Sequence, residues 1–385
     1  MGGSKTKLLL VLAAGIVFLA LFQFKAKDEM ADFEVNYKAG HRLGLGETLY
    51  RTEDQHWQFK YSPFSALIYL PLSFLPVTAA KGVWYLLIIF STGTIVFLSW
   101  KLTGPSMRKR TPLAVLFSCL ILARFFLREV QLGQINMLIT AILMAMIWLI
   151  VANDHSGRAS RERSAGILCG LASALKPYAV IFFPYFILRR KWRVLGSGLI
   201  ILGGSFMAPS IFYGFKGNLD VLGEWITSLS QSTPHLLDSQ DNVSLLAFLV
   251  KWTGNQPLSI TIFGAAVAAL IFMTLIFILQ GKSGGNSILP ESALLLLYIP
   301  LLSPLGWDYT FLSSFLAVVL ILKSFPVFPK TGKVVLAANF LVIALSLYGV
   351  VGRRFYATFM SWSVFTVNFF IVVMALFYLR LKKAV

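Results

Sequence analysis

Long runs of apolar residues constrain the fold of this chain more than any other feature. The runs at 79–100 and 258–280 contain at most one charged residue each. A helix of about 17–25 such residues crosses the hydrocarbon core of a bilayer. The alternating ten-residue pattern of a membrane β-barrel does not occur in the sequence. The chain is therefore predicted to be an all-α polytopic membrane protein.

We expect the spans to occupy most of the chain, with about 10–12 membrane-inserted segments in total. Ten spans are predicted, at 8–24, 79–100, 112–127, 134–152, 194–214, 258–280, 289–303, 309–323, 334–351 and 361–379. The run at 8–24 follows a basic N-terminus and has no small-residue cleavage site after it, so a retained span is favoured over a signal peptide. Only 13% of residues are charged, against about 25% in a typical soluble protein.

The distribution of basic residues predicts an orientation. Basic residues recur in the short loops on one side of the predicted membrane, at 5–7, 101–110, 158–163, 189–193, 282, 323–333 and 380–383. Such loops are typical of the cytoplasmic side, so both termini are predicted to be cytoplasmic and the protein to lie in the cell membrane. The net charge of +18 is explained in this way, and no basic face typical of nucleic-acid binding is present.

The segment 165–188 breaks the pattern. Both of its flanks are basic, yet it is too short to cross the membrane twice. Lys176-Pro177 lies at its centre, and proline ends helices. We expect two short helices, 165–175 and 177–188, that meet at Lys176. Irregular backbone at membrane depth is tolerated only inside protein or along a wet cavity.

Two long segments, 25–78 and 215–257, fall on the outer side of the predicted membrane. The part at 63–75 is apolar but interrupted by prolines, which favours a helix lying at the interface. Neither segment is long enough for a soluble domain, so residues 1–385 are predicted to form one transmembrane domain. An active site, if present, is expected on this outer face.

Polar residues that could carry chemistry cluster in these outer regions. A carboxylate from the first segment can act as a general base, or can be a solvated loop charge; the candidates are Asp28, Glu29, Asp32 and Glu34. Arg124 and Arg128 suit a phosphate, although Arg124 can instead snorkel to the interface. Lys176, at the break, is a functional candidate because charge inside a membrane is costly.

Three further groups complete the candidates. Gln134 and Asn136 lie in the outer turn before the run at 134–152, and Asn242 lies in an Asp-Asn-Val-Ser stretch. Asp308 is expected at the outer end of the bundle, where Arg353 or Arg354 could neutralise it. No nucleotide loop, dinucleotide fingerprint, metal-ligand spacing or cysteine framework occurs, so no metal and no cofactor is predicted.

Several of these residues occur in a familiar order along the chain. The matching residues are Asp32-Phe33, Tyr37, Gly46, Tyr61, Pro63, Pro71-Leu72, Trp84, Gly133-Gln134-Ile135-Asn136, Ala174-Leu175-Lys176-Pro177, Asn242-Val243-Ser244 and Ser303-Pro304 with Trp307. This order resembles the polyprenol-phosphate-mannose-dependent mannosyltransferases of glycosyltransferase family 87, a branch of the GT-C superfamily.

The resemblance implies a GT-C type bundle and a membrane glycosyltransferase. Its donor would be a polyprenyl-phosphate hexose, with mannose the expected sugar, and its acceptor a lipid-linked or glycan hydroxyl. Asp32 matches the family's base, while Lys176, Arg128 and Arg124 would meet the donor phosphate. Substrate contacts are expected from Gln134, Asn136, Asn242, Asp308 and Tyr61. Direct displacement would invert the anomeric centre and give an α-linkage.

One residue departs from the family pattern. The family often has a histidine after Ser-Pro-x-x-Trp, where this chain has Asp308-Tyr309, so its sugar or acceptor can differ. Two other functions remain open. A lipid or lipid-linked-sugar flippase would also use broken helices and intramembrane charge, although no internal repeat is visible. A lipid-binding scaffold is the third alternative.

Overall fold

The computed structural model describes residues 22–23, 26–104, 110–154, 158–281 and 285–385. Over these residues every regular element is helical, and the only β-type pairing is an isolated bridge between Asn242 and Trp307. The prediction of an all-α protein is confirmed. The first predicted span, 8–24, lies outside the described residues except for 22–23.

The helices follow one another with short connections. The longer ones are α4 (Val77–Thr103), α5 (Thr111–Leu132), α6 (Asn136–Asp154), α7 (Ala159–Leu175), α9 (Trp192–Met207), α10 (Ser210–Ser232), α12 (Gln256–Leu279), α13 (Gly285–Leu302), α15 (Lys330–Leu345) and α18 (Val364–Leu381). The shorter ones are α2 (Ala31–Gly44), α3 (Pro63–Tyr69), α8 (Phe182–Leu188), α11 (Leu245–Thr253), α14 (Phe315–Lys323), α16 (Tyr348–Val351) and α17 (Arg353–Ser361). Single 3₁₀ turns include η2 (Thr52–Trp57), η3 (Pro71–Phe74), η5 (Pro177–Ile181), η6 (Pro234–Leu236) and η7 (Asp308–Ser314).

Several of these helices are suited to a bilayer. By length and composition, α4, α12 and α18 can each cross a membrane, and the bent pair α9–α10 would make a fourth span. Five other predicted spans coincide with the helices α5, α6, α13, α14 and α15. Large apolar side chains such as Phe90, Phe272 and Leu279 are exposed on these helices, as expected for surfaces that face lipid. The protein is therefore a polytopic membrane protein.

The structure corrects the predicted span at 194–214. Helix α9 ends at Met207, and α10 begins at Ser210 at an angle of 89° to it. Pro209 lies at the corner, where its missing N–H and fixed ring prevent a continuous helix. Helix α10, which is interrupted at Gly214 (φ 67°, ψ 171°), continues to Ser232 and so extends into the predicted outer segment 215–257.

The predicted break at Lys176 is confirmed. Helix α7 ends at Leu175, and Lys176 is extended, with φ −143° and ψ 133°. Pro177 then opens η5, followed by α8. The residue before a proline is pushed out of the helical region, which explains why the helix ends at this point.

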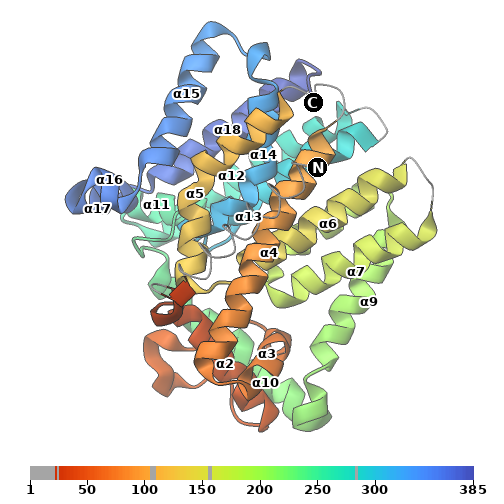
Figure 1. Ribbon diagram of the computed structural model, residues 1–385, viewed down its shortest axis with the longest axis vertical. Coiled ribbons are helices and arrows are strands. Elements are labelled where there is room, and N and C mark those ends of the chain that lie inside the picture. The colour runs from red at the N-terminus through yellow and green to blue at the C-terminus, as the bar shows by residue number, and fades with distance from the viewer. Residues whose placement is uncertain (1–21, 24–25, 105–109, 155–157, 282–284) are drawn as a thin grey trace, which may run out of the picture.

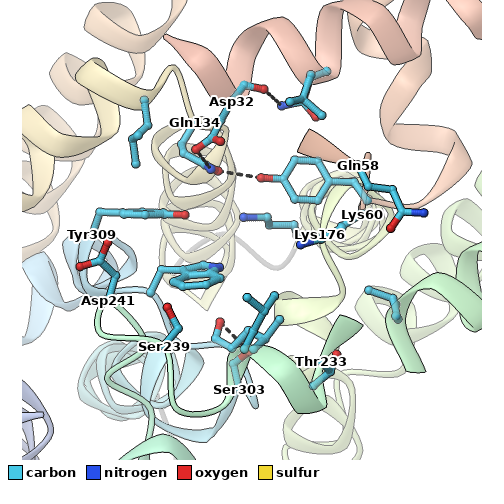
Figure 2. Close-up of a pocket in the computed structure, with 18 of the residues that line it drawn as sticks. Asp32, Gln58, Lys60, Gln134, Lys176, Thr233, Ser239, Asp241, Ser303 and Tyr309 are labelled. Atoms are coloured by element: carbon cyan, nitrogen blue, oxygen red, sulfur yellow. Dashed lines mark hydrogen bonds between the residues drawn. The ribbon is translucent and has the colours of Figure 1, made fainter. Parts of the chain in front are cut away.

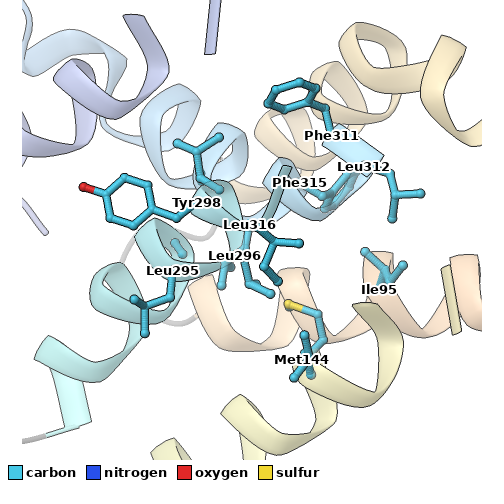
Figure 3. Close-up of a cluster of buried hydrophobic side chains, with 14 of the residues drawn as sticks. Ile95, Met144, Leu295, Leu296, Tyr298, Phe311, Leu312, Phe315 and Leu316 are labelled. Atoms are coloured by element: carbon cyan, nitrogen blue, oxygen red, sulfur yellow. The ribbon is translucent and has the colours of Figure 1, made fainter. Parts of the chain in front are cut away.

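The bundle has two different ends (Figure 1). Helices α2, α3 and α10 gather at its lower end, and α4 runs away from them toward Thr103. At the opposite end, Lys323 Nζ donates to the Thr103 carbonyl at 2.5 Å. Between the ends lies a dry core in which α13, η7 and α14 pack against α4 and α6, with Leu296, Phe315 and Met144 at the contact (Figure 3).

Candidate active site

Helix α2 is held firmly against the turn between α5 and α6. Met30 N donates to the Gln131 carbonyl at 2.8 Å, and the Trp84 indole N–H donates to the Gly133 carbonyl at 2.9 Å. Gly133 has φ 69°, and a Cβ there would lie 2.7 Å from Phe33 Cβ. Only glycine fits this position without displacing α2. The contact fixes the first turn of α2, which carries Asp32.

The Asp32 carboxylate is oriented by a chain of two hydrogen bonds. Gln134 Nε2 donates to Asp32 Oδ2 at 2.6 Å, and the Tyr61 hydroxyl donates to Gln134 Oε1 at 2.6 Å (Figure 2). Because the Tyr61 hydroxyl donates to the amide oxygen of Gln134, the amide nitrogen is the atom that meets the Asp32 carboxylate. Among the described residues, Oδ1 of Asp32 has no hydrogen-bond partner, so it is available to a ligand.

Lys176 lies close to this chain at the helix break. Its Nζ donates to Asn136 Oδ1 at 2.9 Å and lies 4.5 Å from the centre of the Tyr61 ring and 5.1 Å from that of Tyr178. The lysine is 4% exposed. Two aromatic faces and an amide oxygen therefore hold a buried ammonium at the edge of the cavity described next.

These side chains line a cavity of about 530 Å³ (Figure 2). The volume lies within the range of about 300–1,000 Å³ found for small-ligand sites. Its charged residues are Asp32, Asp241, Lys60, Arg128 and Lys176, and its aromatic residues include Trp57, Tyr61, Tyr178, Trp225, Trp307 and Tyr309. Cationic groups and a carboxylate with a free oxygen therefore share one space.

Lys60 is a cavity residue that the sequence did not single out. It precedes Tyr61, and the Trp225 indole donates to its carbonyl at 3.1 Å. Burial lowers the pKa of the Lys60 ammonium, and the nearby Asp32 charge partly opposes that shift. A basic residue beside Tyr61 was the available signal, but nothing in the sequence showed that this part of the chain lies against Lys176.

Comparison with known proteins places the chain in a family. A family model for glycosyltransferase family 87 matches residues 59–304. This chain belongs to glycosyltransferase family 87. The match includes Lys60, Gln134 and Lys176, while Asp32 precedes it.

Mycobacterial proteins are among the relatives of this family 87 chain. The polyprenol-phosphate-mannose-dependent alpha-(1-2)-phosphatidylinositol pentamannoside mannosyltransferase of Mycolicibacterium smegmatis is 27% identical over 271 residues, which cover 67% of this chain and 60% of the relative. An alpha-(1->3)-arabinofuranosyltransferase of Mycobacterium tuberculosis H37Rv is 25% identical over 252 residues, covering 64% of this chain and 52% of the relative. The alignments thus span between about half and 60% of the relatives' own length.

In this family 87 protein, the four acidic residues after the first predicted span have different surroundings. Glu34 pairs with Lys81 Nζ at 2.7 Å, Glu29 accepts from Gln131 at 3.4 Å, and Asp28 is exposed. Of the four, Asp32 alone lines the cavity. The structure therefore distinguishes Asp32 from Asp28, which spacing in the sequence did not.

Arg124 and Asp308 form an ion pair with each other. Arg124 Nη2 is 2.6 Å from Asp308 Oδ2, and the guanidinium also donates to Ser346 and Tyr356. Both charges are buried, and neither residue lines the cavity. The expected phosphate role of Arg124 and substrate role of Asp308 have no support in this geometry. Arg124 also replaces Arg353 and Arg354 as the partner of Asp308.

Asn242 is likewise behind the cavity wall. Its Oδ1 accepts from Gly306 N at 3.1 Å, and its Nδ2 donates to the Pro304 carbonyl at 3.0 Å. The side chain is fully buried, and its amide is used to hold the loop 303–307. Asn242 does not line the cavity, and through this loop it holds Trp307 in the cavity wall.

The other predicted residues lie at the cavity or directly behind it. Arg128, Gln134 and Tyr61 line it, and Asn136 contacts Lys176 from behind. Arg128 donates to Gln131 Oε1 at 2.9 Å and lies 3.9 Å from Asp241 Oδ2, with its side chain 38% exposed. Such a loose, exposed pair is weak, so Arg128 can exchange Asp241 for an anionic ligand.

Proposed function

We propose that this family 87 protein transfers a hexose, with mannose the favoured sugar, from a polyprenyl-phosphate donor to a hydroxyl of a lipid-linked or glycan acceptor. The observation that carries the proposal is the cavity that Lys60, Lys176 and Arg128 line together with Asp32, whose Oδ1 accepts no hydrogen bond from any described residue. The name of the Mycolicibacterium smegmatis relative, which specifies polyprenol-phosphate-mannose, supports the donor class.

The proposed chemistry needs one base and one set of cations. Asp32 takes the proton of the acceptor hydroxyl, and the acceptor oxygen forms a bond to the anomeric carbon. The bond from that carbon to the phosphate oxygen breaks, and the electron pair leaves with polyprenyl phosphate. The ammonium groups of Lys176 and Lys60 stabilise the charge that develops on the leaving oxygen. One displacement inverts the centre, so a β-linked donor gives an α-linked product.

The proposed side of the membrane is the outer face. The cavity is lined by residues of α2, α10 and the loop after α13. Helices α2 and α10 lie at the end of the bundle opposite the contact between Thr103 and Lys323 (Figure 1). Basic loops that favour the cytoplasm are predicted at that opposite end. An outer-face site also suits a lipid-linked sugar, because its polyprenyl chain remains in the bilayer while the phosphate enters the cavity.

The test compares wild type with Asp32→Asn in proteoliposomes supplied with radiolabelled polyprenyl-phosphate-mannose and a membrane-lipid acceptor pool. We expect transfer by wild type and a loss of about 10²–10⁴-fold in the variant, the range for a general base. Asp28→Asn is the matched control, since Asp28 is exposed and outside the cavity lining. Equal transfer by the two variants would remove Asp32 from the proposed role.

A flippase is the second candidate, because the break at Lys176 puts a charge between two short helices. The same proteoliposomes distinguish the two. A flippase would expose labelled donor to an external reagent without forming a product, and Asp32→Asn would leave that exposure unchanged. Donors carrying glucose or arabinofuranose, run beside mannose, then identify the sugar.

A further inference from the structure

A buried carboxylate that the proposed chemistry does not use lies directly behind the cavity. Glu129 is in the last turn of α5 and is fully buried. Its carboxylate accepts from Asn136 Nδ2 and from Met137 N, the latter at 3.2 Å. Burial of an ionised carboxylate is costly unless the charge is compensated. Glu129 therefore stays ionised only beside a compensating positive charge, and its contacts lead to one.

Asn136 connects Glu129 to Lys176. The amide donates through Nδ2 to Glu129 and accepts through Oδ1 from Lys176 Nζ at 2.9 Å. Because a carboxylate can only accept, it fixes the orientation of the Asn136 amide and turns its oxygen toward the lysine. Glu129 and Lys176 are thus opposite charges joined through one side chain.

The indirect contact has a consequence for Lys176. Among the described residues no carboxylate lies within ion-pair distance of its Nζ, and its other neighbours are the faces of Tyr61 and Tyr178. An ammonium has three N–H donors, and Asn136 takes one. Asn136 and Glu129 therefore stabilise the positive charge from the side away from the cavity, and the other N–H donors remain for a ligand that enters from the cavity.

The main chain of Glu129 supports the other half of the site. Its carbonyl accepts from Gly133 N at 2.9 Å and from Gln134 N at 3.1 Å. This closes the turn from which Gln134 reaches Asp32. One residue therefore anchors both the amide that orients the base and the amide that orients the cation.

We infer that Glu129 is a positioning residue: its charge, passed through Asn136, keeps Lys176 protonated and directed at the phosphate of a polyprenyl-phosphate ligand without competing for it. The inference rests on the proposed function for the identity of that ligand. A direct Glu–Lys pair would occupy the ammonium, whereas the intervening amide leaves it available. Glu129 itself touches no cavity ligand, since it does not line the cavity.

The experiment measures binding of polyprenyl phosphate, the sugar-free product, to protein in nanodiscs. The variants are Glu129→Gln, Lys176→Met and the double variant. We expect Glu129→Gln to weaken binding about tenfold, the value of one charge-assisted hydrogen bond. In the Lys176→Met background the same change should cost less than about twofold, because its effect passes through the lysine.

Three results would overturn the inference. They are unchanged binding in Glu129→Gln, an equal loss with and without Lys176, and no binding of polyprenyl phosphate by wild type. An equal loss would mean that Glu129 only supports the fold. If Glu129→Gln does not fold, Asn136→Ser cuts the same link and should give the same dependence on Lys176. Turnover separates the two proposals: binding with the expected pattern but no sugar transfer refutes the proposed function and leaves this inference standing.

Discussion

Two buried glutamates at different places in the bundle are neutralised in opposite ways. Glu291 in α13 contacts its cations directly: Arg189 Nε lies 2.9 Å from Oε2, and Arg380 Nη2 lies 2.5 Å from Oε1. Tyr185 also donates to it at 2.9 Å. Glu129 reaches its cation only through an amide, and that cation borders a cavity.

The difference separates a structural network from the one that we propose to be functional. The Glu291 cluster joins α8, α13 and α18, and its arginines also donate to the carbonyls of Phe277 and Ile278 at the end of α12. Its charges are compensated within the protein, so it fixes four helices without needing a ligand. Lys176 has N–H donors that no described residue accepts. We expect these unused donors, more than burial alone, to distinguish a binding site.

The largest expected effect is on stability, from Glu291→Gln. The change leaves the buried guanidinium of Arg380 and the partly buried one of Arg189 without a carboxylate, and breaking such a buried network costs about 3–5 kcal/mol. Unfolding in detergent by denaturant should show the loss, while transfer per folded molecule should remain at the wild-type level. Glu34→Gln is the control, because its carboxylate is 44% exposed and Lys81 retains hydrogen bonds to the carbonyls of Lys27 and Glu29. A loss of transfer without a loss of stability would contradict the comparison.

Lys176→Met should show the reverse pattern. Removing a cation that stabilises the leaving phosphate is expected to lower kcat/KM by about 10²–10³-fold. Stability should fall less than in Glu291→Gln, because Lys176 makes no direct ion pair among the described residues and methionine fills similar apolar space between Tyr61 and Tyr178. Initial rates and denaturant unfolding of the same preparations check both parts. Equal losses of stability in Lys176→Met and Glu291→Gln would mean that both networks stabilise the fold to the same extent, against the distinction between them.

The features that the sequence predicted well depend on local chemistry. The break at Lys176 was predictable because Pro177 acts on the residue immediately before it. Helix α4 was predictable because a long apolar run has few alternatives in a bilayer. The bend between α9 and α10 was missed because apolar residues continue across Pro209 to Phe215, and hydropathy alone does not show a change of direction.

The site was less predictable, because its contacts join distant parts of the chain. Gln134 and Asp32 are 102 positions apart, and Arg124 and Asp308 are 184 apart. From residues alone Asp32 was one of four equivalent carboxylates, and the resemblance to family 87 selected it. Arg124 and Asp308 were each suspected of function because each is a charge near the membrane. Their mutual pairing, which removes that reason, is visible only in the fold.

The pH dependence of Lys60→Arg sharpens the distinction among the cavity cations. Burial lowers the pKa of the Lys60 ammonium, so it loses its proton at a lower pH than an ordinary lysine does. Transfer that uses this charge should decline on the alkaline side, and arginine, which stays protonated, should move the decline to higher pH. At pH 7 the two rates should agree within about threefold, because both side chains are charged. Lys38→Arg, on an exposed face of α2, is the control, and an unchanged alkaline limb in Lys60→Arg would exclude Lys60 from phosphate binding.

The smallest effect is expected from replacing Arg124 and Asp308 together, as Arg124→Met with Asp308→Leu. Their charges satisfy one another away from the cavity, and an apolar pair of similar volume often replaces a buried ion pair at no net cost, whereas either single change leaves an unpaired charge worth about 3–5 kcal/mol. The double variant should therefore fold and keep kcat/KM within about threefold, while each single variant unfolds more readily. Transfer and denaturant unfolding of the three variants provide the measurement. A loss of transfer in the folded double variant as large as that of Lys176→Met would mean that Arg124 and Asp308 contribute to the site. A direct ion pair could then serve catalysis, as the indirect pair at Lys176 is proposed to do.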